Sequence, residues 1–194
     1  LIFIAVIKTM ASAGSIKKIL KVVFVTGATG FIGTRLVSEL SKQGVTLRIL
    51  SRKRHPVFDT VVCDLNHEKV PRHALESVNT VFHLAGHAHD LLDTDDKKNL
   101  YHVVNTESTT RIVELAANEG VERFVYVSSV KAGGSAVTVQ HLTEEDQAEP
   151  EGVYGKTKRE AELKVLETGR RSGMHVAVVR PALVYGAGVK GNLR

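Results

Sequence analysis

The chain has 194 residues, of which 43% are hydrophobic and 24% are charged, and this size and composition predict one globular domain with a buried core. Its 26 basic and 21 acidic residues give a net charge of +5, which suits a phosphate-bearing ligand, whereas 5% aromatic residues and the lack of tryptophan leave little stacking surface for single-stranded nucleic acid. We therefore expect no nucleic-acid partner, and the apolar run at residues 1–7 is too short to cross a membrane.

Residues 1–20 are expected to form an N-terminal extension ahead of the first strand. Met10 is a candidate natural start, which would make residues 1–9 tag or upstream sequence, and an extra edge strand is the alternative. The segment lacks the small-residue cleavage pattern of a signal peptide. Cys63 is the single cysteine and cannot form an internal disulfide, so a reducing, cytoplasmic location is expected.

The sequence TGATGFIG at residues 26–33 follows an apolar run and leads into a stretch with one apolar face, which predicts a strand, a glycine turn and a helix. Gly27 and Gly30 let backbone N–H groups approach a pyrophosphate, and Gly33 lets the helix pack closely on the strand. The partial positive charge of the helix N-terminus then faces the anion. We interpret the turn as a dinucleotide-binding site, with an ordinary turn between strand and helix as the alternative.

Short apolar runs alternate with helical patterns along the chain, which predicts an α/β fold, a Rossmann-type doubly wound parallel sheet with helices on both faces. Strands are expected at residues 21–26, 46–51, 60–63, 80–85, 123–128 and 175–180. Helices are expected at residues 33–43, 100–119 and 154–172, with a short turn at 71–76, a long loop at 132–152, and glycine caps at Gly120 and Gly173. Ligands of such a sheet bind at the carboxyl ends of its strands.

Tyr154 and Lys158 are four residues apart on a predicted helix, so their side chains share one face. A nearby ammonium favours the phenolate and lowers the tyrosine pKa, which makes Tyr154 a candidate general acid or base. Ser128 and Ser129 end a predicted strand at the ligand edge, where a hydroxyl can bond a substrate oxygen. The alternatives are an exposed helix pair and two serines that only terminate the strand.

His83, His87, His89 and Asp90 lie close together in the sequence and suggest a metal site. However, His83 belongs to a strand while the others follow a glycine, and no cysteine or further carboxylate completes the ligand set. We therefore expect no metal.

Seven motifs in order make the chain, from about residue 21 to 194, resemble the extended short-chain dehydrogenase/reductase superfamily. The resemblance is to its NAD-dependent epimerase/dehydratase branch, which acts on nucleotide-linked sugars. The motifs are TGATGFIG at 26–33, Asp64-Leu65, HLAG at 83–86, Asn105, Ser128-Ser129, YGKTK at 154–158 and RPALVYG at 180–186. The resemblance implies an NAD(P)-binding Rossmann domain at residues 21–194, truncated before a C-terminal substrate-binding part that is largely absent.

Carried over by position, the resemblance implies that Tyr154 is the catalytic acid or base, that Lys158 activates it and contacts the ribose, and that Ser129 bonds the substrate. Asn192 is implied to reach the substrate diphosphate. A structural bond to the backbone is the alternative for Asn105. The implied cofactor contacts are Gly27, Thr29, Gly30, Phe31, Ile32, Gly33, Ser51, Arg52, Asp64, Leu65, Leu84, Ala85, Gly86, Asn105, Tyr154, Lys158, Pro181 and Leu183.

The second strand departs from the usual NAD pattern, because it runs into Arg52, Lys53 and Arg54 instead of an acidic residue that accepts the ribose hydroxyls. Arg52 favours a 2′-phosphate, so NADP is expected to bind at least as well as NAD, with a solvated basic turn as the alternative. The implied function is a UDP-hexose 4-epimerase that oxidises and re-reduces the sugar carbon, working as a homodimer through the helices at 100–119 and 154–172. An NADPH-dependent ketoreductase and a non-catalytic dinucleotide-binding protein are the alternatives. A cofactor-binding half with little turnover is a further alternative for this polypeptide.

Overall fold

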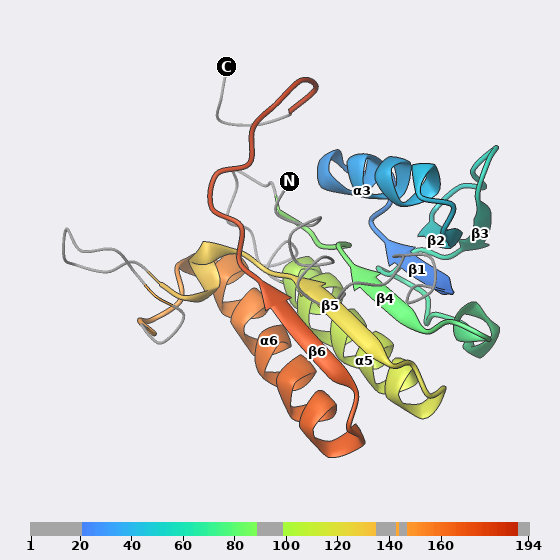
Figure 1. Ribbon diagram of the computed structural model, residues 1–194. Coiled ribbons are helices and arrows are strands. Elements are labelled where there is room, and N and C mark those ends of the chain that lie inside the picture. The colour runs from blue at the N-terminus through green and yellow to red at the C-terminus, as the bar shows by residue number, and fades with distance from the viewer. Residues whose placement is uncertain (1–20, 89–98, 135–142, 144–146, 190–194) are drawn as a thin grey trace.

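The protein forms a parallel six-stranded sheet in which the strands lie in the order β3-β2-β1-β4-β5-β6 (Figure 1). The structure, a computed structural model, describes residues 21–88, 99–134, 143 and 147–189. The strands are β1 (Val22–Thr26), β2 (Thr46–Ser51), β3 (Asp59–Val62), β4 (Thr80–His83), β5 (Arg123–Val127) and β6 (His175–Val179). The predicted α/β class and the parallel, Rossmann-type sheet are therefore confirmed.

Helices cover both faces of this sheet, α3 on one side and α5 with α6 on the other (Figure 1). The helical segments are α3 (Phe31–Lys42), the 3₁₀ turn η1 (Arg72–Leu75), the π-helical segment η2 (His102–Glu107), α5 (Ser108–Asn118), the 3₁₀ turn η3 (Val130–Ala132) and α6 (Gly152–Ser172). Within the described residues, no helix combines the length and the apolar character needed to cross a bilayer.

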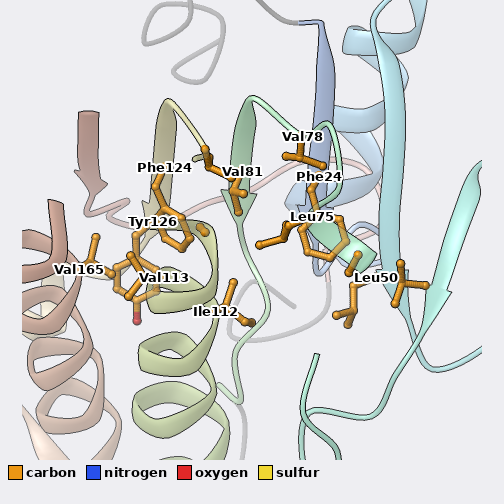
Figure 2. Packing of buried hydrophobic residues seen from close by; sticks show 14 of the residues in the cluster. Phe24, Leu50, Leu75, Val78, Val81, Ile112, Val113, Phe124, Tyr126 and Val165 are labelled. Carbon is orange, nitrogen blue, oxygen red and sulfur yellow. The ribbon is translucent and has the colours of Figure 1, made fainter. Parts of the chain in front are cut away.

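Alternating side chains of each strand divide the core into two clusters. Phe24 and Tyr126 pack with Val113 of α5 and Val165 of α6, as Figure 2 shows. The neighbouring Val23, Val25 and Val125 point to the opposite face and pack with Leu36, Val37 and Leu40 of α3. Because successive side chains of a strand point to opposite faces, strands that are buried on both sides read as continuous apolar runs, which is why the sequence predicts them well.

The predicted strands and the helices α3 and α6 agree with the structure to within two residues at each end, and two of the differences have a local cause. Strand β4 stops at His83, two residues before the predicted end, because the N–H of Ala85 donates to the Thr26 hydroxyl (3.1 Å) instead of continuing the sheet ladder. The expected continuous helix at residues 100–119 contains the π-helical segment η2 before α5 begins. The glycine caps are confirmed, since Gly120 and Gly173 have φ of 73° and 75° after α5 and α6.

The glycine turn after β1 is built from close backbone contacts. A Cβ atom at Gly33 would lie 2.1 Å from the carbonyl oxygen of Gly27, so α3 can approach the turn only with glycine at this position. Gly27 has φ of 68°, and a Cβ atom there would lie 2.7 Å from the backbone nitrogen of Ala85. Gly27 is therefore required by the neighbouring segment after β4 as well as by the turn itself.

We predict that Gly33→Ala destabilises the protein more than Gly120→Ala. The added methyl group at residue 33 has to displace the Gly27 carbonyl, which we expect to lower the free energy of unfolding by about 3 kcal/mol. Gly120 has open space around its Cβ position, so its alanine variant meets only the left-handed backbone cost of about 1 kcal/mol. Urea unfolding of both variants measures the difference, and equal losses would contradict the close contact at Gly33.

Candidate active site

Predicted site residues follow all six parallel strands. The strands end at one edge of the sheet, which Figure 1 shows. Backbone hydrogen bonds join the segments beyond the strand ends, from the Leu84 N–H to the Thr26 oxygen (3.2 Å) and from the Ser128 N–H to the Val179 oxygen (2.8 Å). The glycine turn, the segment at 84–86, the serine pair and the segment at 180–181 thus form one continuous edge.

The glycine turn presents the N-terminus of α3 without a capping side chain. Gly30 is the N-cap residue, it makes no side-chain capping bond, and the first turn of α3 carries no acidic residue. The first N–H groups of a helix have no intrahelical partner, and the helix dipole adds a partial positive charge. The described residues of this turn therefore fit the diphosphate of a dinucleotide.

Lys158 holds its ammonium group almost completely out of water, with 3% of the residue exposed. Its Nζ donates to the carbonyl oxygen of Val127 at 2.7 Å and lies 4.3 Å from the centre of the Tyr126 ring. Burial lowers the pKa of Lys158 to about 7, and the carboxylate of Glu162 partly opposes this shift. The side chain is therefore poised between its charged and neutral forms near neutral pH.

The Ser129 hydroxyl lies close enough to the Tyr154 phenol to favour its ionised form. The Ser129 oxygen accepts the N–H of Lys131 at 3.3 Å, and its own hydrogen remains available to a ligand or to the phenol. Burial raises the pKa of Tyr154, and the Ser129 hydroxyl opposes the rise. The expectation that Lys158 lowers this pKa is therefore wrong for the protein alone, because the ammonium is turned to Val127 and Tyr126.

One aromatic ring that the sequence did not reveal adjoins Tyr154. Tyr101 is 8% exposed and meets the Tyr154 ring edge to face, with centroids 6.1 Å apart. The His87 ring packs against Tyr101, with centroids 4.7 Å apart. Tyr101 lies 53 residues before Tyr154, so no local spacing could reveal the contact.

Asn105 is completely buried in the π-helical segment η2, and its side-chain amide forms two hydrogen bonds with the backbone of His87. Its Oδ1 accepts the His87 N–H at 2.8 Å, and its Nδ2 donates to the His87 oxygen at 3.0 Å. Asn105 therefore anchors the segment after β4. A Cβ atom at Gly86 would lie 3.2 Å from Asn105 Oδ1 and 3.6 Å from Lys158 Nζ, so the glycine keeps the space between these groups open.

The expected adenosine contacts lie at the ends of β2 and β3. Ser51 is half-buried and accepts the Lys53 N–H, while Arg52 is exposed. The Asp64 carboxylate accepts the Asn66 N–H at 3.0 Å, and the Leu65 side chain is buried in the core. Leu65 can therefore offer a ligand only its backbone.

An open cavity of about 570 Å³ lies between α3 and the connection from β2 to β3. Its lining includes Ala28 and Thr29 of the glycine turn and the stacked rings of His55 and Phe58, whose centroids are 4.9 Å apart. It does not include Tyr154 or Lys158, so the cavity borders the expected cofactor site on the side of the basic turn.

His83 is fully buried between two threonine hydroxyls. Its Nδ1 lies 2.6 Å from Thr26 Oγ1, and its Nε2 lies 2.8 Å from Thr109 Oγ1. Burial lowers the pKa of His83 to about 3, and the charge of Lys158 lowers it further. His83 is therefore neutral and structural in this network.

The remaining predicted site residues are placed as follows. Pro181 is half-buried after β6, whereas Leu183 is 66% exposed. Asn192, His89 and Asp90 lie outside the described residues. Within the described part of the chain, no three histidine, cysteine or acidic side chains are grouped so that they could hold a metal ion.

Comparison with known proteins gives matches along most of the chain. The profile of the NAD dependent epimerase/dehydratase family matches residues 23–194. The UDP-glucose 4-epimerase of Vibrio cholerae is 35% identical over 185 residues, which cover 91% of this chain and 56% of that protein. The putative dihydroflavonol 4-reductase of Synechocystis sp. is 35% identical over 173 residues, which cover 84% of this chain and 49% of that protein.

A solved structure of MoeE5 in complex with UDP-glucose and NAD superimposes with a TM-score of 0.69 and 34% identity. The superposition covers 80% of this chain and 52% of that chain. The chain thus spans about half the length of the curated relatives it matches.

We predict that His83 makes the stability of the protein depend on pH below neutrality. The histidine binds a proton near pH 6.5 when unfolded but only near pH 3 when folded, so the unfolded state binds more protons between these values. The free energy of unfolding should therefore fall with decreasing pH, with a contribution from His83 of up to about 1.4 kcal/mol per pH unit. Urea unfolding of His83→Gln should show a slope between pH 6 and 4 that is smaller by this amount, and an unchanged slope would contradict the assignment.

Proposed function

The chain belongs to the NAD-dependent epimerase/dehydratase family, and from this premise we propose that it is the cofactor-binding part of a nucleotide-sugar 4-epimerase, acting on a UDP-hexose. The observation that carries the proposal is the Ser129 hydroxyl near the Tyr154 phenol, with the buried Lys158 one turn further along α6, at the same sheet edge as the uncapped N-terminus of α3. The similarity to UDP-glucose 4-epimerase and to MoeE5 with UDP-glucose and NAD supports the substrate class.

In this proposal Tyr154 exchanges a proton with the sugar hydroxyl, and Ser129 orients both groups. The nearby Ser129 hydroxyl favours the phenolate form of Tyr154. A ligand that draws the Lys158 ammonium from Val127 toward its ribose would also bring the charge closer to Tyr154. Cofactor binding would thereby offset the effect of burial, which raises the Tyr154 pKa in the protein alone.

The proposed cofactor is NAD or NADP, held with its diphosphate at the α3 N-terminus and its ribose near Lys158. When bound, the nicotinamide supplies a reversible hydride acceptor. Pro181 would line its pocket, and the aromatic rings of Tyr101 and Tyr154 would restrict water on the substrate side. Binding of NADP at least as tightly as NAD is supported by the exposed Arg52 and by the neighbouring cavity at Thr29 and His55, which leaves space for a 2′-phosphate.

A one-way NADPH-dependent ketoreductase is the second candidate function. It is favoured by Arg52 and by the similarity to the putative dihydroflavonol 4-reductase. The two functions differ in the fate of the cofactor, which a 4-epimerase regenerates in each turnover and a reductase consumes. Retention of the cofactor through purification supports the epimerase, and stoichiometric consumption supports the reductase.

A homodimer built from α5 and α6 is part of the proposal, as is a location in the reducing cytoplasm. Leu163 and Leu166 on α6 are 51% and 37% exposed, although most other leucines of the described chain are buried. Exposed leucines on one long helix are suited to pairing across a two-fold axis.

We predict that calorimetric titration will detect NADP binding at least as tight as NAD binding, followed by UDP-glucose binding to the loaded protein. Arg52→Ala should weaken NADP about tenfold and leave NAD unchanged, because it removes one contact to the 2′-phosphate. Lys69→Ala is the control, since it removes another exposed basic side chain. Clearly tighter NAD binding would refute the NADP preference, and binding of neither cofactor would refute the proposed function.

We predict that static light scattering will give twice the mass of one chain. The double variant Leu163→Glu and Leu166→Glu should be monomeric, because four buried carboxylates would face each other in the dimer. Val57→Glu, at a position 75% exposed near the opposite edge of the sheet, should remain dimeric. A wild-type monomer would end the dimer proposal.

A further inference from the structure

A buried ion pair joins the helix that carries Tyr154 and Lys158 to the strand that leads into the expected nicotinamide pocket. Glu162 on α6 is 2% exposed and accepts two hydrogen bonds from Arg180, at 2.8 Å from Nε and 2.5 Å from Nη2. This parallel arrangement is the strong, geometrically specific form of a guanidinium and carboxylate contact. Arg159 adds a more distant contact of 3.6 Å to the same carboxylate.

Glu162 lies four residues after Lys158 on α6, so the two side chains share one face of the helix. Both are buried, and within the described residues Glu162 is the carboxylate that stabilises the charged form of Lys158. The other contacts of the ammonium are neutral, namely the Val127 oxygen and the Tyr126 ring. The charge of Glu162 therefore acts directly on the protonation of Lys158.

Arg180 extends the same network to the loop that follows β5. Its Nη2 donates to Gln147 Oε1 at 3.1 Å, and that oxygen also accepts from Arg159. A Cβ atom at Gly133 would lie 2.9 Å from Nη1 of Arg180, so the guanidinium packs directly on the loop backbone. Through Arg180, Glu162 is tied to the chain just after Ser129 and just before Tyr154.

We propose that Glu162 and Arg180 form a positioning pair that sets the charge on the Lys158 ammonium and holds α6, the loop after β5 and the segment after β6 in register. The proposal rests on the proposed function only in that Lys158 is taken to contact the cofactor. Neither residue touches the reacting atoms. Arg180 neutralises Glu162 in part, so the attraction between Glu162 and Lys158 is set by how firmly Arg180 is held.

Among the described residues, the charged and titratable groups that contact Lys158 or act on its charge are Glu162 on α6, Tyr126 on β5 and His83 on β4. Arg180, after β6, acts through Glu162, and Tyr154 lies one helical turn before Lys158 on α6. His83 and Tyr126 remain neutral near pH 7, because burial lowers the pKa of the first and raises the pKa of the second. Near neutral pH the charges of Glu162 and Arg180 are therefore the ones whose removal by substitution should change the pKa of Lys158.

The two partners should affect Lys158 in opposite directions, which a purely structural ion pair would not do. Glu162→Gln removes the attractive charge and leaves Arg180 unneutralised, so the pKa of Lys158 should fall by about one unit from about 7. Arg180→Gln frees the Glu162 carboxylate, so the pKa of Lys158 should rise by about one unit. Titration of ¹³Cε-lysine-labelled full chain by NMR measures both, with the Lys158 signal assigned from a Lys158→Met sample.

The affinity for NAD supplies a second readout. The charged ammonium is the form that donates to a ribose hydroxyl, so affinity should fall as pH rises through the Lys158 midpoint, and the midpoint should move down in Glu162→Gln and up in Arg180→Gln. Shifts in the same direction, or no shift in either variant, would overturn the positioning pair. A wild-type protein that binds no NAD at any pH would refute the proposed function, while the NMR midpoints would still decide the pair.

A milder variant keeps the test decisive if either substitution at the buried pair prevents folding. Arg159→Gln removes the partly exposed second cation from Glu162 and should raise the Lys158 midpoint by a few tenths of a unit. Lys156→Gln is the matched control, because its side chain is 57% exposed and pairs with Glu149 instead. An equal shift in both variants would contradict the role of Glu162.

Discussion

The ammonium of Lys158 lies out of water between the carbonyl oxygen of Val127 and the ring of Tyr126, and the arrangement of α6 follows from this contact. A buried lysine keeps its charge only where oxygen atoms, a ring face or a carboxylate replace water. α6 must therefore lie close to the end of β5, where Val127 stands. Gly155 permits a close approach to η3, the turn that follows, because a Cβ atom there would lie 2.5 Å from the Lys131 oxygen.

The parallel sheet adds a second constraint, since all its strands end at the same edge. Beyond that edge the chain is fixed by bonds between segments instead of by the sheet ladder. The Ala85 N–H bonds the Thr26 hydroxyl, the Val130 N–H bonds the Pro181 oxygen, and the amide of Asn105 holds His87. The segments that carry the proposed site are thus held from several directions, which preorganises the site before any ligand binds.

The sequence predicted the sheet and its flanking helices well, because strands such as β1 and β5 are buried on both faces and read as continuous apolar runs. The sequence also placed Ser129 at a strand end and Tyr154 and Lys158 on one helix, and the structure has them there, but their joint role in catalysis stays a prediction. The sequence did not predict the direction of the Lys158 ammonium, which depends on the Val127 carbonyl. Tyr101 and the partnership of Glu162 with Arg180 were also missed, because long-range packing creates these contacts. The i, i+4 spacing of Lys158 and Glu162 was the one local signal in the sequence that Glu162 lies on the same helix face as Lys158.

The hydrogen bonds around His83 fit one neutral tautomer and link the end of β1 to α5. Thr26 Oγ1 accepts the N–H of Ala85, so its own hydrogen is free to point to Nδ1 of His83, 2.6 Å away. A neutral imidazole whose Nδ1 accepts must carry its hydrogen on Nε2, which then donates to Thr109 on α5. One directed series of hydrogen bonds therefore runs from Ala85 after β4, through Thr26 at the end of β1 and the ring of His83, to Thr109 on α5. A protonated His83 would reverse the bond to Thr26 and place a second cation near Lys158. The low pKa of His83 thus preserves both the position of the turn and the charge of the lysine.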